Sequence, residues 1–103
     1  MALVALITGL LGLAFGSAIP VRADSSEAEC QLSWADRTLA DERGPCWFSQ
    51  RQGNVDIRFG ARAFHYPAAD QGRVYQRSNS SAGIRFRLEG QYSLQVRWRL
   101  PSE

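Results

Sequence analysis

The chain has 103 residues, of which 45% are hydrophobic, and its formal net charge of +2 comes from a basic set made only of arginine. This length leaves room for one folded domain. The nearly balanced charge argues against a nucleic-acid partner, and two cysteines with one histidine cannot supply a closed zinc site of four protein ligands.

The N-terminal segment has the features of a secretory signal peptide. Residues 2–19 form an uncharged apolar run, Pro20 follows it, and Val21 and Ala23 occupy the −3 and −1 positions of a cleavage site. We expect residues 1–23 to form a signal helix that is cleaved after Ala23, so that the mature chain is periplasmic or secreted, in a bacterium. The alternatives are an uncleaved membrane anchor, since a span needs roughly 20 apolar residues, and a misplaced start codon.

The mature chain is predicted to begin with a loose polar tail over residues 24–29, followed by a single β domain over 30–103. Leu32 and Trp34 alternate with polar residues and predict a first strand near 30–35. Residues 36–45 form a polar connection that ends in the turn signal Gly44-Pro45.

Cys30 and Cys46 are the only cysteines of the chain. In an exported protein such a pair is predicted to form a disulfide. The closed loop of about 16 residues would contribute roughly 3 kcal/mol in the loop-entropy model.

Residues 46–59 predict a β-hairpin. A two-residue turn at Gly53-Asn54 would place Phe48 opposite Phe59. One face of this hairpin would then be apolar, and the other would carry Trp47, Ser49, Asp56 and Arg58.

The segment that follows is mixed. Tyr66-Pro67 disfavours a central strand, residues 74–76 are a short strand candidate, and residues 79–81 are expected to turn.

The strongest periodicity of the chain lies in residues 83–100, where apolar and polar side chains alternate on both sides of Glu89-Gly90. The two apolar sets share a face only if Leu88 opposes Tyr92 and Phe86 opposes Leu94, which requires an odd loop or a bulge. The sequence therefore predicts an all-β fold of about six short antiparallel strands, in a meander that forms a small barrel or sandwich.

Nothing in the sequence has the spacing of a catalytic site. His65 is the only histidine, no nucleophile is spaced to it, and the carboxylates occur beside arginines in polar segments. We expect no enzymatic activity, no cofactor and no metal.

The arginines of the last hairpin are the main candidate for a binding site. Arg85, Arg87, Arg97 and Arg99 would all point away from its apolar face, where they repel one another unless carboxylates or an anionic partner lie close. Arginine presents a fork of donors that suits carboxylate and phosphate. The two interpretations left open are a binding face for an anionic envelope component or acidic protein, and an ordinary solvated surface.

Trp47 beside Arg58 is a second candidate contact, as a stacking platform or an interface anchor. The alternative is a tryptophan that the segment 60–70 covers.

Two resemblances bear on function. The pattern Cys30-x-Leu32-x-Trp34, Leu39-x-Asp41 and Gly44-Pro45-Cys46-x-Phe48 resembles small exported bacterial proteins of unknown function in which a disulfide ties these segments. Ser81-Ala82-Gly83 with Arg85 is weakly similar to the periplasmic and membrane-bound inhibitors of c-type lysozyme, which are small exported β-barrels. The expected function is a non-enzymatic binding module that uses its arginine face. The alternatives are a lysozyme-type enzyme inhibitor and a small structural envelope protein.

Overall fold

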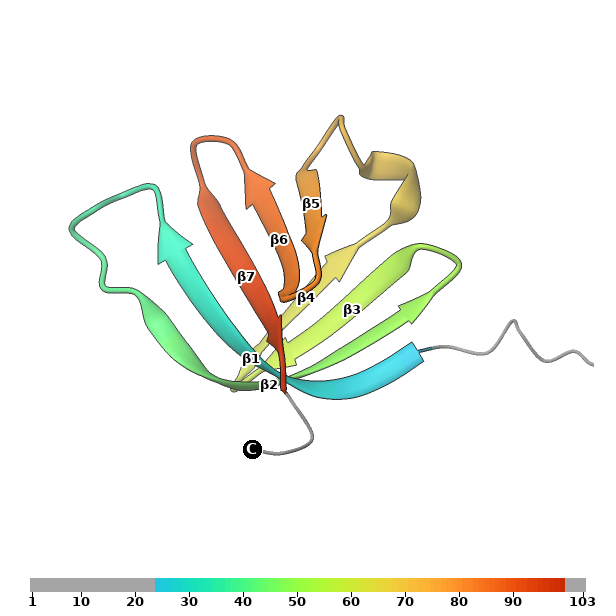
Figure 1. Cartoon of the computed structure of the whole chain (residues 1–103). Coiled ribbons are helices and arrows are strands. Elements are labelled where there is room, and N and C mark those ends of the chain that lie inside the picture. Colours follow the sequence, from blue (N-terminus) through green and yellow to red (C-terminus); the bar gives the residue numbers. More distant parts are fainter. Residues whose placement is uncertain (1–23, 100–103) are drawn as a thin grey trace, which may run out of the picture.

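The computed structural model describes residues 24–99, which form one antiparallel sheet of seven strands in the order β4-β3-β2-β1-β7-β6-β5. The strands are β1 (Asp24–Trp34), β2 (Glu42–Arg51), β3 (Asn54–Phe59), β4 (Arg62–Tyr66), β5 (Gln76–Ser80), β6 (Gly83–Leu88) and β7 (Tyr92–Trp98), and a 3₁₀ turn, η3 (Ala68–Asp70), precedes β5. The sheet curls into a half-barrel (Figure 1). The predicted all-β antiparallel class is confirmed, with seven strands instead of about six.

The chain builds this sheet from two meanders that meet in the middle. One runs from β1 to β4 and the other from β5 to β7, and the pairing of β1 with β7 joins them. Residues 24–99 contain no helix that is long and apolar enough to cross a membrane. The predicted signal peptide, residues 1–23, lies outside the described residues.

The prediction of a loose tail over residues 24–29 is wrong, because these residues form the first half of β1. They pair with β2 from Asp24 opposite Gln50 to Glu29 opposite Pro45. Ala28 is fully buried, while its neighbours Glu27 and Glu29 face away from the core. Alanine is too small to give a clear hydrophobic signal between two glutamates, so the pattern Glu27-Ala28-Glu29 does not indicate a strand by sequence alone.

The register predicted for the first hairpin is also wrong, by two residues. Phe48 pairs with Ile57, not with Phe59, and the loop is Gln52-Gly53. Both loop residues have positive φ, 54° and 85°, as a type I′ turn requires. A shift of two residues preserves which side chains share a face, so the predicted apolar face is nevertheless correct.

The last hairpin has the predicted register. Leu88 pairs with Tyr92 and Phe86 with Leu94 around an odd loop over residues 89–91. The turn before it lies later than expected, at residues 81–82, because Asn79 and Ser80 belong to β5.

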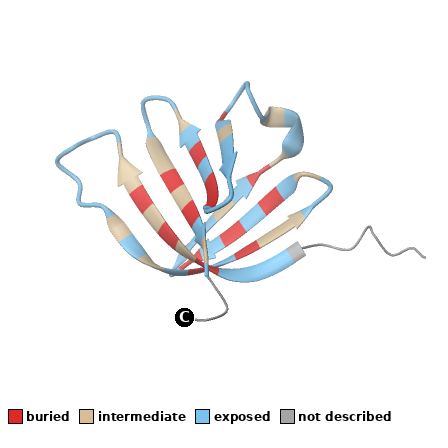
Figure 2. Ribbon diagram, in the orientation of Figure 1, coloured by how far each residue is buried: buried red, intermediate tan, exposed pale blue. Residues whose placement is uncertain are grey.

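The core lies on the concave side of the curled sheet, and the buried residues recur at every second position of the strands (Figure 2). Phe86 of β6 stacks on Tyr66 of β4 with ring centroids 4.1 Å apart and planes 2° apart. This contact joins strands that are not neighbours in the sheet, and it closes one end of the half-barrel. Trp34, Phe64 and Tyr92 extend the aromatic packing at that end.

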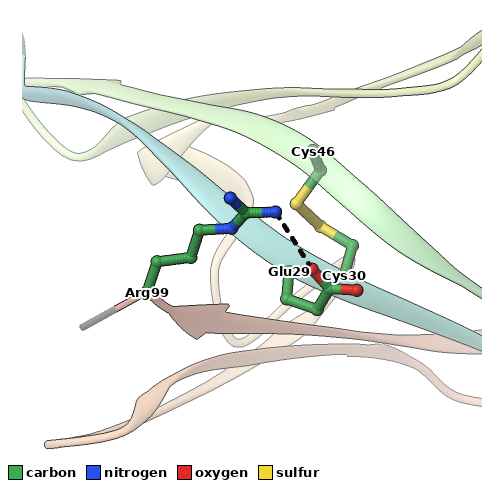
Figure 3. The surroundings of a disulfide bond; sticks show 4 residues. All are labelled: Glu29, Cys30, Cys46 and Arg99. Atoms are coloured by element: carbon green, nitrogen blue, oxygen red, sulfur yellow. Dashed lines mark ion pairs between the residues drawn. A yellow bond between two sulfur atoms is a disulfide. The ribbon is translucent and has the colours of Figure 1, made fainter. Parts of the chain in front are cut away.

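The predicted disulfide is present between Cys30 of β1 and Cys46 of β2, with Cα atoms 5.8 Å apart (Figure 3). Both cysteines are buried on the concave side. The adjacent Glu29 points to the other side, where it meets Arg99.

Candidate functional site

The four arginines of the last hairpin lie on the convex side of the sheet, and all four are exposed. They occupy the positions of β6 and β7 that alternate with the buried Ile84, Phe86, Leu94 and Val96, and Arg99 directly follows β7. In register, Arg87 opposes Ser93 and Arg85 opposes Gln95. The structure therefore gathers Arg85, Arg87, Arg97 and Arg99, here called the arginine face, on one surface.

Nearby carboxylates neutralise this positive charge only in part. Arg87 is 3.6 Å from Glu89, and Arg99 is 3.7 Å from Glu27 and 3.5 Å from Glu29. These distances exceed those of a charge-assisted hydrogen bond, and ion pairs between exposed groups contribute little.

The other two arginines of the face contact no carboxylate. Arg85 donates a hydrogen bond of 2.9 Å to the neutral Oε1 of Gln95. Among residues 25–99 no acidic side chain lies within ion-pair distance of Arg97. Both guanidinium groups thus retain donors for an external anion.

A shallow polar hollow of about 330 Å³ lies beside Arg85. Its floor is formed by Ser33 and Ser93, which oppose each other on β1 and β7. The longer Gln31 and Gln95 form its sides together with Arg85. Gln31 already donates to Asp41, but Arg85, the two serines and Gln95 supply hydrogen-bond donors around the hollow, which suits a phosphate or carboxylate oxygen.

Trp47 and Arg58 face each other across β2 and β3 on the same convex side. The Trp47 side chain is 45% exposed, so the segment 60–70 does not cover it. Glu27 of β1 lies between this pair and Arg99, since it pairs with Trp47 in register and contacts Arg99. The predicted second contact, Trp47 with Arg58, is therefore on the same surface as the arginine face. It is separated from that face by β1, which carries Glu27 and Glu29 on this side.

His65 forms a close contact with a carboxylate that the sequence did not reveal. Its Nδ1 lies 2.7 Å from Oδ1 of Asp56, and both side chains are about 60% exposed on the convex side. Ser49 opposes Asp56 on the strand away from His65, so the three residues do not have the order of a catalytic triad. Across residues 24–99 no group of three His, Cys, Asp or Glu side chains could hold a metal ion.

The residues of the lysozyme-inhibitor resemblance are divided between two surfaces. Ser81 and Ala82 form the exposed tip between β5 and β6, whereas Arg85 belongs to the convex face. Gly83 is buried, and a Cβ atom built on it would lie 1.9 Å from the backbone oxygen of Val96. This glycine therefore has a structural explanation that does not involve a lysozyme.

A second hollow lies on the concave side, and no pattern in the sequence indicates it. It measures about 390 Å³, and one of its lining residues, Arg77, lies over the ring of Phe86. Gln50 and Arg77 contribute to it from strands that are far apart in the sequence, so only the curvature of the sheet reveals their proximity.

Comparison of the chain with protein-family models, with curated proteins and with solved structures gives no match. The functional argument therefore depends on the geometry of this molecule.

Proposed function

We propose that this protein is a non-enzymatic binding module of the bacterial envelope that attaches to a phosphate-bearing anionic surface through its arginine face. The observation that carries the proposal is the incomplete neutralisation of four arginines on one hairpin, two of which contact no carboxylate among the described side chains. The hollow between Arg85 and the two serines adds neutral donors beside that charge.

The shape of the surface supports a broad, flat partner. The arginines project from adjacent antiparallel strands on the convex side, where a membrane or a large envelope polymer has unhindered access. The buried disulfide agrees with residence in an oxidising compartment, as does the signal peptide predicted for residues 1–23.

The proposal is tested by sedimentation with vesicles of phosphatidylglycerol or of phosphatidylcholine. The purified protein should bind the anionic vesicles and not the zwitterionic ones, and binding should weaken as salt rises, because exposed charges are screened over about 8 Å at physiological ionic strength. The double variant Arg85→Glu/Arg97→Glu should bind at least about tenfold more weakly, since each basic residue at an anionic surface contributes about 1 kcal/mol.

The matched control is Arg51→Glu/Arg73→Glu, which changes the net charge equally but alters two exposed residues outside the arginine face, one at the end of β2 and one in the loop before β5. It should bind within about threefold of the unmodified protein, and both variants should keep its thermal midpoint within a few degrees. If both double variants lost vesicle binding equally, the binding would depend on net charge alone and not on the arginine face. That result, or no binding to phosphatidylglycerol, would contradict the proposal.

A further inference from the structure

The concave hollow has the composition of a ligand site. Phe48, Ile84 and Trp98 supply its apolar surface, and Phe48 meets Trp98 edge to face with ring centroids 5.1 Å apart. Polar side chains surround this surface: Ser25, Ser26, Gln50, Arg77, Asn79 and Ser80. A volume of about 390 Å³ lies within the range of small-molecule and peptide-side-chain pockets, which combine apolar walls with a few placed polar groups.

One polar atom of the hollow lacks the partner that burial normally demands. The Oε1 atom of Gln50 is buried and accepts no hydrogen bond from any described residue. Such an acceptor is costly unless a donor reaches it.

Arg77 is a half-buried cation in the wall of the same hollow. It lies beside the face of Phe86, with its guanidinium carbon 5.7 Å from the ring centroid, and its Nε donates to Oδ1 of Asn79 at 2.9 Å. No carboxylate among the described side chains pairs with it. The hollow therefore offers one cation beside an apolar floor.

The backbone next to the hollow is also unpaired. β5 is an edge strand that pairs only with β6, and Figure 1 shows it at one end of the curled sheet. Ser80 and Gly83 close a two-residue loop, so they form a hydrogen-bonded pair, and every second pair along the ladder does the same. The N–H and C=O groups of Arg77 and Asn79 consequently point to the open edge while their side chains line the hollow.

We propose that β5 and the concave hollow together bind the C-terminal end of an extended peptide whose last side chain is apolar. The peptide adds a strand along the free backbone of Arg77 and Asn79, which is a recurrent mode of peptide recognition. Its apolar side chain enters the pocket on Phe48 and Trp98, and its terminal carboxylate binds the guanidinium of Arg77. This site lies on the opposite side of the sheet from the arginine face and does not depend on that function.

The test uses the purified protein and the peptide acetyl-Ala-Ala-Phe with a free carboxylate, followed by two-dimensional NMR of the tryptophan indole N–H signals. The Trp98 signal, assigned with Trp98→Phe, should move on titration, while the signals of Trp34 and Trp47 should stay in place. The same peptide with a C-terminal amide should bind about ten- to a hundredfold more weakly, the range expected for loss of a charge-assisted contact. The variant Arg77→Gln should bind acid and amide with equal affinity, and the convex-face variant Arg97→Gln should behave like the unmodified protein.

A further arm distinguishes a peptide site from a simple site for apolar anions. Octanoate and phenylacetate carry a carboxylate and an apolar group but no peptide N–H, so they should bind at least about tenfold more weakly than the peptide. The proposal is overturned if these acids bind as well as the peptide. It is equally overturned if acid and amide forms bind alike, or if the Trp98 signal does not move.

Discussion

Gly83, the first residue of β6, lies against the backbone of β7. A Cβ at this position would be 1.9 Å from the backbone oxygen of Val96, and backbone atoms cannot move aside as a flexible side chain can. Gly83→Ala should therefore lower the free energy of unfolding by about 1–3 kcal/mol, the usual cost of overpacking, when measured by urea denaturation.

Gly90→Ala is the matched comparison for this prediction. Gly90 has φ of 78° but open space around its missing Cβ, so its substitution adds only the backbone cost of about 1–2 kcal/mol. Unchanged stability of Gly83→Ala would show that β6 and β7 do not approach as described.

Phe86 is fully buried and links β6 to β4 through its stack on Tyr66. Phe86→Ala should cost about 3–5 kcal/mol, because the substitution loses buried surface and leaves a cavity. Leu39→Ala, at a residue 49% exposed, should change the free energy of unfolding by less than about 0.5 kcal/mol in the same urea titrations. Similar effects at the two positions would contradict the assignment of the core.

Single residues also explain where the sequence was sufficient and where it was not. The period of two identified the buried side chains of the last hairpin, because each strand there alternates large apolar residues with polar or charged ones. It could not identify Gln50, a polar residue on the concave side, or the pairing of His65 with Asp56. Both depend on how separate strands are placed beside one another.

At the scale of elements, the disulfide fixes β1 to β2 in the centre of the sheet. Cys30→Ser/Cys46→Ser should lower the free energy of unfolding by about 2–5 kcal/mol, as removal of a disulfide does in other small secreted domains. Thiol titration of the unmodified, unfolded protein without reductant should find no free thiol. Two titratable thiols would contradict the structure.

The two hairpins show what limits prediction of strand pairing. In the last hairpin the apolar sets require an odd loop, and the turn signal Glu89-Gly90 selects the three-residue loop that is observed. In the first hairpin, turns at Gln52-Gly53 and Gly53-Asn54 preserve the same faces, so hydrophobicity cannot distinguish them. The structure uses the former, with a positive φ at the non-glycine Gln52.

At the scale of the whole molecule, Tyr66 couples stability to alkaline pH. Burial, reinforced by the 3.1 Å contact with the Tyr92 hydroxyl, raises the pKa of Tyr66 well above its ordinary value of 10.0. An unfolded tyrosine ionises near pH 10 while the folded one stays neutral, so this contribution is complete below pH 10 and is lost as pH rises above it.

Tyr66→Phe should therefore lose stability less steeply between about pH 10 and 11.5 than the unmodified protein, in urea titrations at each pH. The matched control is Phe64→Leu, which changes a ring of the same aromatic cluster but no ionisable group, so its stability should fall as steeply with pH as that of the unmodified protein. Parallel loss of stability in the unmodified protein and Tyr66→Phe would contradict the role assigned to this burial.

The curvature of the sheet is the feature that the sequence conceals most completely. Pairing of β1 with β7 places the meander β1–β4 beside the meander β5–β7, which are far apart in the sequence. The convex arginine face and the concave hollow both depend on this pairing. The arginine positions were predictable from local alternation, whereas the hollow lined by Gln50 and Arg77 was not.

The most direct test of the account is to map by NMR which backbone amides respond when micelles of dihexanoyl phosphatidylglycerol are added to the protein. We predict that the largest shifts occur at residues 85–87 and 95–97 and at Ser33 and Ser93, and that they fade as salt is raised. Shifts concentrated on the concave side or in the loops, or none at all, would contradict the assignment of the arginine face as the binding surface.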